Sequence, residues 1–121
     1  MARFEDRVKD TTTTTGTGDI TVAGTPPTGF QGFSVFGVGD IVSVAVVHQT
    51  ANEWEIFVAP MSSSTVIQRS NAVLTTASST GGTPVSFSAG TKDVFVTISA
   101  NDIDQRDSRS NNYAHRLFGA F

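Results

Sequence analysis

The stretch IVSVAVVHQTANEWEIFVA, residues 41–59, decides the fold because it carries two apolar segments on either side of a short polar break. The first segment, Ile41 to Val47, is rich in β-branched residues, which favour a strand buried on both faces or packed against a second layer. The second segment alternates between an apolar face and a mixed face, as strand residues do. With the linking residues 48–52, the two segments predict a β-hairpin.

The two faces of the second segment predict which side of this hairpin is buried. Trp54, Ile56 and Val58 point to one side, so we expect them to face the core. Glu53 and Glu55 point to the other side, about 7 Å apart by the rise of a strand, which overlaps the separation of paired glycosidase carboxylates. Two glutamates on one strand lack the facing geometry of such a pair. We therefore interpret them as a charged, solvated outer face.

Short strand candidates separated by turn-forming residues fill the rest of residues 11–100. Their spacing of about 8 to 12 residues is typical of all-β folds. We predict a small antiparallel β-sandwich or barrel with extended N- and C-terminal arms. The expected strands cover residues 11–15, 19–23, 65–69, 72–76, 85–88 and 93–99. The first two of these are expected to form one hairpin and the last two another.

Apolar residues that share a strand face predict the core. Phe30, Phe33 and Phe36 follow a stiff loop that contains Pro26 and Pro27. We expect an irregular segment there that inserts all three rings into the core. The strand residues expected in the core are Ile20, Val22, Val44, Val46, Trp54, Ile56, Val58, Val94, Val96 and Ile98.

Composition restricts the class of protein. The chain of 121 residues has a net charge of −3 and no cysteine, which excludes disulfides and cysteine-ligated metal sites. Lysine and arginine are not clustered, so we expect no nucleic-acid binding. No apolar run reaches membrane-spanning length, and the charged N-terminus is unlike a signal peptide. We therefore expect synthesis in the cytoplasm and no membrane insertion.

The titratable residues predict no catalytic or metal site. His48 lies in the expected hairpin loop and His115 near the end of the chain, and neither has further ligands at metal spacing. We expect His48 to be a solvated side chain. No strand-turn-helix nucleophile motif occurs among the many serines. The sequence therefore predicts a protein that is not an enzyme and has no cofactor.

The two ends of the chain differ from its body. Residues 1–10 and 101–121 are dense in charge yet neutral overall, and we interpret them as an N-terminal arm and a C-terminal docking tail that flank a β domain of residues 11–100. Aromatic side chains gain nothing in a solvated tail, which indicates contact with a partner. A frayed arm and a tail packed on its own domain are the alternatives. The residues expected to dock are Phe4, Arg7, Tyr113, Arg116, Leu117, Phe118 and Phe121.

Five segments occur in an order that is more specific than any one of them alone. They are RVKDTTTTTGTGDITVAG (residues 7–24), GFQGF (29–33), EWEIFVA (53–59), QRSNAVL (68–74) and VSFSAGTKDVFVTISA (85–100). Together they resemble a small β module that occurs in virion proteins of tailed bacteriophages, including tail-fibre and related proteins. The chain departs from the module at residues 59–61, and residues 101–121 have no counterpart in it. The resemblance implies no catalytic residue.

The resemblance implies a non-enzymatic structural protein of a tailed-phage virion, attached as a tail or fibre component or as a capsid decoration protein. Its partners would be other virion proteins and further copies of the chain. We expect a homotrimer, because phage fibres and three-fold decoration proteins are commonly trimers. The alternative is a carbohydrate-binding module for a host-surface glycan, with the sugar at Trp54, Tyr113 or the loop of residues 24–29.

Overall fold

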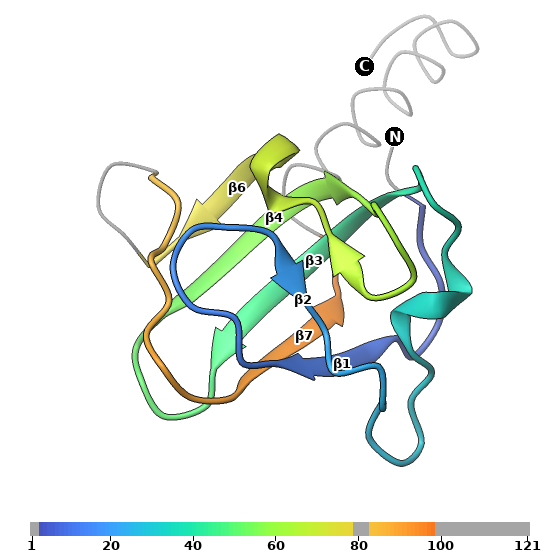
Figure 1. Cartoon of the computed structure of the whole chain (residues 1–121), viewed down its shortest axis with the longest axis horizontal. Coiled ribbons are helices and arrows are strands. Elements are labelled where there is room, and N and C mark those ends of the chain that lie inside the picture. Colours follow the sequence, from blue (N-terminus) through green and yellow to red (C-terminus); the bar gives the residue numbers. More distant parts are fainter. Residues whose placement is uncertain (1–2, 79–82, 99–121) are drawn as a thin grey trace, which may run out of the picture.

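The structure is a computed structural model, which describes residues 3–78 and 83–98. It contains two antiparallel sheets and short 3-10 turns (Figure 1). The larger sheet has five strands in the order β1-β7-β3-β4-β6. Their bounds are β1 Lys9–Thr12, β3 Ile41–His48, β4 Trp54–Pro60, β6 Val73–Ala77 and β7 Lys92–Val96. The expected all-β, antiparallel fold is confirmed.

The hairpin predicted from residues 41–59 forms the centre of the larger sheet. β3 pairs with β4 from Ile41 opposite Pro60 to Val47 opposite Trp54. On its other side, β3 pairs with β7. Both edges of β3 are therefore hydrogen-bonded, and most of its side chains are buried. A run of β-branched residues suits such a central strand.

A two-stranded sheet covers one face of the larger sheet (Figure 1). It joins β2 (Ile20–Thr21) to β5 (Val66–Ile67), with Ile20 opposite Ile67. Both isoleucines are fully buried, and the core lies between the two sheets. The larger sheet contributes Val42, Val44, Val46, Phe57, Ala59 and Val94 to this core.

The two outer hairpins expected from the sequence are wrong. β2 pairs with β5, and it forms no ladder with β1; a bridge between Thr12 and Val22 and a hydrogen bond from the N–H of Ala23 to the carbonyl of Thr11 join the two segments. Residues 85–88 do not pair with β7, because Phe87 bridges Gly16 and β7 lies between β1 and β3. Strands from distant parts of the chain occupy both edges of β7. No edge is left for its neighbour in sequence.

The burial expected for β4 is also wrong, because the strand directs the opposite face to the core. Trp54, Ile56 and Val58 are half-buried on the side of the sheet away from the core, whereas Glu55 and Phe57 are fully buried. The remaining predicted core residues divide as follows: Ile20, Val22, Val44, Val46 and Val94 are buried in the core, Val96 is half-buried against it, and Ile98 is 48% exposed.

A buried ion pair explains how β4 can turn a glutamate inward. Arg69, in the 3-10 turn η2 (Arg69–Asn71), donates from Nε to Oε2 of Glu55 at 2.7 Å and from Nη2 to Oε1 at 2.8 Å. The backbone N–H of Val85 also donates to Oε1, at 2.8 Å. The two charged side chains are at most 2% exposed. A buried carboxylate is tolerated when a counter-ion and hydrogen bonds are both supplied, and Glu55 has both.

The guanidinium of Arg69 also fixes two segments that lie outside the named strands. Nη2 donates to the carbonyl of Val85 at 2.6 Å, and Nη1 donates to the carbonyl of Gly16 at 3.0 Å. The guanidinium carbon lies 5.1 Å from the centre of the Phe87 ring. The ion pair therefore connects β4 to the turn at Gly16 and to residues 85–87.

The described N-terminal residues lie against the body of the protein and do not form a separate arm. The backbone N–H of Arg3 donates to the carbonyl of Ile41. The Arg3 guanidinium binds Glu5 at 2.8 Å and Asp40 at 2.6 Å. Val8 is buried, and β1 begins before the expected domain boundary at residue 11.

Only two of the three phenylalanines after the proline loop enter the core. Phe33 and Phe36 are buried at the 3-10 turn η1 (Phe33–Val35). Phe30 is half-buried beneath the side chains of Arg7 and Lys9. The expectation of three core rings is therefore wrong for Phe30, whose ring serves as a platform for two cations.

Replacing Arg69 by methionine tests the role of the ion pair. Arg69→Met leaves the Glu55 carboxylate buried without a counter-ion, so we expect the free energy of unfolding to fall by about 3 to 5 kcal/mol. Urea denaturation measures the change. Arg3→Met is the matched control, because solvent screens the exposed Arg3 pairs and the loss should be small. Equal losses in the two variants would contradict the importance of the buried pair.

Candidate functional sites

His48, expected to be a solvated loop residue, is buried at the end of β3. Its Nδ1 accepts hydrogen bonds from the backbone N–H groups of Thr50 at 3.1 Å and Ala51 at 3.0 Å. Nδ1 is therefore unprotonated, and Nε2 carries the hydrogen that it donates to the carbonyl of Ala89 at 2.9 Å. Both ring nitrogens fasten the β3–β4 loop to the turn that precedes β7.

The turn beside His48 requires a glycine. Gly90 has a φ of +123°, and a Cβ at this position would lie 2.9 Å from Cε1 and 3.0 Å from Nε2 of His48. A side chain at Gly90 would therefore meet both backbone strain and the buried imidazole.

Gly90→Ala should lower the free energy of unfolding by about 1 to 3 kcal/mol, through this strain and the close contact. Gly39→Ala is the matched control, because Gly39 also has a positive φ, of +89°, and no atom lies within 4 Å of its Cβ position. Urea denaturation of both variants measures the difference. If the two substitutions cost the same, the imidazole does not constrain this turn.

The two glutamates that suggested a carboxylate pair have separate structural partners. Oε1 of Glu53 accepts hydrogen bonds from the backbone N–H of Ser88 at 2.9 Å and from its hydroxyl at 3.0 Å. The bond from the Ser88 N–H is the main reason that the pKa of Glu53 lies below its usual value. Glu55 is bound to Arg69 and to the N–H of Val85. The expectation of a wet glutamate face is wrong for Glu55, which is buried.

The lowered pKa of Glu53 predicts a loss of stability in acid. A carboxyl whose pKa is lower in the folded chain stabilises the fold above its unfolded pKa, and the contribution disappears as pH falls through the folded pKa. Glu53→Gln should therefore be less stable than the parent at about pH 7, and the difference should shrink at about pH 3. Urea unfolding at both pH values tests this. A difference that does not change with pH would contradict it.

Lys92 is a buried cation that also serves the fold. It lies opposite His48 across the β3–β7 pair, and its Nζ donates to the carbonyl of Thr14 at 2.8 Å. Burial lowers the pKa of Lys92, and attraction to the Glu53 carboxylate opposes this effect. The side chain is fully buried, so its ammonium holds the threonine run in place and does not face a ligand.

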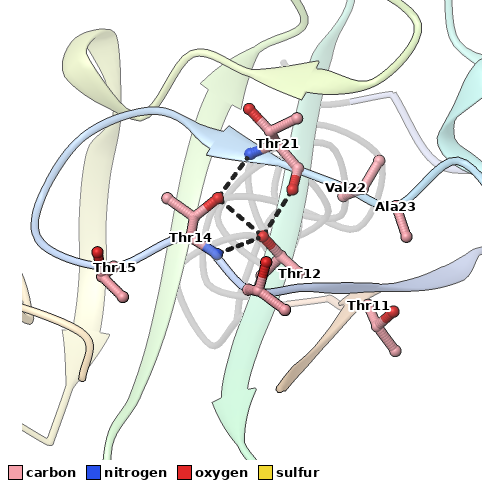
Figure 2. A pocket seen from close by; sticks show the side chains of 8 residues that line it. Thr11, Thr12, Thr14, Thr15, Thr21, Val22 and Ala23 are labelled. Carbon is pink, nitrogen blue, oxygen red and sulfur yellow. Dashed lines mark hydrogen bonds between the residues drawn. The ribbon is translucent and has the colours of Figure 1, made fainter. Parts of the chain in front are cut away.

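The threonine run lines a pocket of about 420 Å³ beside β2 (Figure 2). Oγ1 of Thr12 donates to the carbonyl of Thr21 at 2.6 Å, and Oγ1 of Thr14 accepts from the N–H of Thr21 at 3.1 Å. These side-chain hydrogen bonds join the threonine run to β2, where the expected hairpin would have had a ladder of backbone hydrogen bonds. The lining consists of Thr11, Thr12, Thr13, Thr14, Thr15, Thr21, Val22 and Ala23. None of these side chains titrates, so the pocket offers a ligand only neutral hydrogen bonds and methyl groups.

A second pocket, which we call the edge pocket, lies where the N-terminal residues meet β7. Its volume is about 330 Å³. The guanidinium carbon of Arg7 lies 4.3 Å from the centre of the Phe30 ring, and Nζ of Lys9 lies 5.4 Å from it. The pocket is lined by Glu5, Arg7, Val8, Lys9, Phe30, Phe95 and Val96. It therefore combines positive charge with apolar surface.

The face of the larger sheet that points away from the core, here called the outer face, carries apolar side chains from four strands. In one row across the sheet, Phe95 of β7 lies opposite Ala45 of β3, which lies opposite Ile56 of β4. In another row Val73 of β6 lies opposite Val58 of β4, and Val73 is 66% exposed. The outer face comprises Val47, Trp54, Ile56, Val58 and Phe95, which are half-buried, Val73, which is exposed, and Ala45, which is buried. Apolar surface of this kind suits contact with a second apolar surface.

The residues expected to dock on a partner have different outcomes. Phe4 is half-buried, and Arg7 lines the edge pocket. The others, Tyr113, Arg116, Leu117, Phe118 and Phe121, lie outside the described residues, as does His115. The sequence analysis missed the edge-pocket residues Lys9, Phe30 and Phe95, which come from three separate parts of the chain. The one sequence signal for the edge pocket was the position of Lys9, a second cation two residues from Arg7.

In residues 3–78 and 83–98, no group of three histidine, aspartate or glutamate side chains is placed to hold a metal ion. That part of the chain also contains no helix long and apolar enough to cross a membrane. Comparison with protein-family models, with curated proteins and with solved structures finds no match.

Proposed function

We propose that the chain is a non-enzymatic structural subunit of a tailed-phage virion, attached as a tail or fibre component or as a capsid decoration protein. Its partners are other virion proteins and further copies of the same chain. The resemblance of residues 7–100 to a β module of such proteins supports this role. The way in which the chain uses its polar and apolar side chains supports it further.

The outer face is the observation that carries the proposal. Apolar side chains from four strands lie on it, and Val73 is 66% exposed. Transfer of apolar surface out of water contributes about 25 cal/mol per Å², and this contribution must exceed the cost of lost translational and rotational freedom for an assembly to form. β6 is also the last strand of the sheet, and edge strands pair readily with other chains. We place the contact with a neighbouring virion protein on this side of the molecule.

The residues that could have indicated catalysis serve the fold. His48 bonds through both ring nitrogens, Glu53 is bound by Ser88, and Glu55 is paired with Arg69. Each group is engaged inside the chain, in contacts that stabilise loops between strands. This use of polar side chains favours a scaffold that presents surfaces to partners.

The proposal predicts that the chain is present in purified particles of the phage that encodes it, in a fixed number of copies. Quantitative mass spectrometry measures the copy number, and immunogold electron microscopy locates the chain on head or tail. Absence from purified particles would refute the proposal.

A surface variant tests whether the outer face makes the contact. Val73→Lys should lower the copy number at least tenfold, because a charge placed in an apolar interface costs 1.4 kcal/mol or more, which is about a factor of ten in affinity. Val38→Lys is the matched control, because Val38 is 77% exposed in the loop before β3, outside the outer face. Circular dichroism should show both variants folded. If Val73→Lys is incorporated at the normal copy number, the contact with the neighbouring virion protein does not lie on the outer face.

A host-surface carbohydrate-binding module is the second candidate, and the position of Trp54 favours it. Trp54 is half-buried on the outer face and is therefore not a core residue. An accessible tryptophan can stack on the face of a sugar. A glycan array with the parent chain and Trp54→Ala separates the two functions, because binding that depends on Trp54 requires a sugar site. Absence of binding would leave the virion subunit as the proposed function.

A further inference from the structure

The edge pocket contains a cation that has no polar partner among the described residues. Nζ of Lys9 lies 5.4 Å from the centre of the Phe30 ring, and within the described residues it makes no hydrogen bond or ion pair. Lys9 also lies directly opposite Phe95 across the β1–β7 pair. Its ammonium therefore lies beside the Phe30 ring, and its hydrogen-bond donors are not used by any described residue.

Arg7 supplies a second cation in a constrained position. Its φ of +54° makes it the one residue other than glycine with a positive φ in the described part of the chain. Such a backbone conformation is uncommon and costs energy, and it persists where the surroundings demand it. Nε of Arg7 donates to the carbonyl of Gly29 at 3.0 Å, while the guanidinium lies over Phe30 at 4.3 Å. The bond to Gly29 uses one of five donors, and stacking fixes the plane of the rest.

The charges of the pocket do not balance. Glu5 is the acidic residue of its lining, and Glu5 is bound to Arg3 at 2.8 Å. In residues 3–78 and 83–98, the positive charges of Arg7 and Lys9 therefore lack a carboxylate of their own. The remaining lining is apolar and consists of Val8, Phe30, Phe95 and Val96.

We propose that the edge pocket binds an organic carboxylate joined to an aromatic or aliphatic group. The carboxylate lies between Arg7 and Lys9, where the guanidinium fork and the ammonium both donate hydrogen bonds to it. The apolar group lies against Phe30 and Phe95. An inorganic anion would satisfy the charge and leave the apolar lining in water, so the pocket favours a ligand that carries both parts. The proposal does not depend on the virion role.

Two sources of such a ligand share this chemistry. One is an acidic residue next to an aromatic residue in a partner protein, and the other is a free aromatic acid. The row that runs from Lys9 through Phe95 and Ala45 to Ile56 joins the pocket to the outer face. A partner segment bound to the outer face could therefore place its acidic side chain in the pocket.

Titration of the isotopically labelled full chain, followed by NMR, tests the proposal. Phenylacetate should shift the amide signals of Lys9, Phe30 and Phe95 and saturate in about the millimolar range expected for so small a ligand. Phenylethylammonium keeps the ring and reverses the charge, and inorganic phosphate keeps the negative charge and lacks the ring. Neither should saturate in the same range. An equal response to all three probes, or none to phenylacetate, would overturn the proposal.

Variants at Lys9 test whether its ammonium contacts the carboxylate of the ligand. Lys9→Gln should weaken phenylacetate binding at least threefold, whereas Lys9→Arg, which keeps the positive charge in the pocket lining, should retain it. A dispersed spectrum confirms that each variant is folded. Unchanged binding by Lys9→Gln would overturn the assignment. The peptide acetyl-Phe-Glu-amide forms the second arm: tighter binding than phenylacetate indicates a protein partner, and weaker binding indicates a free acid.

Discussion

The buried ion pair between Glu55 and Arg69 is the interaction on which the rest of the structure depends. It joins a central strand to a 3-10 turn, and through the same guanidinium it holds the carbonyls of Gly16 and Val85. These connecting segments have little regular hydrogen bonding of their own. Such a pair recovers the cost of removing two charges from water only when nearly every donor and acceptor is used, as they are here.

Other polar side chains of the molecule are also used for contacts within the chain. His48, Lys92 and Glu53 each fasten a loop to a neighbouring segment, and the threonine hydroxyls complete the backbone bonding between β1 and β2. The outer face is apolar, and the edge pocket beside it adds the positive charges of Arg7 and Lys9. These are the two surfaces on which we propose that partners bind.

Sequence reasoning succeeded where local pattern and packing agree. The β3–β4 hairpin forms as expected, and Ile20, Val44 and Val94 are in the core. It failed for β4, where alternation defines two faces and does not say which is inside. Burial of the apolar face was the natural choice. Arg69, 14 residues away in a polar turn, reversed it by neutralising Glu55.

The sequence by itself determined the class of fold, because β-branched runs, glycine and proline turns and the period of two are local properties of the chain. Only the tertiary structure decided which strands are neighbours, which face of β4 is buried and where two cations meet aromatic rings. These features depend on contacts between residues far apart in the chain, such as Lys9 with Phe95 and Gly16 with Phe87. Their energies are set by burial and pairing in three dimensions, which no local pattern encodes.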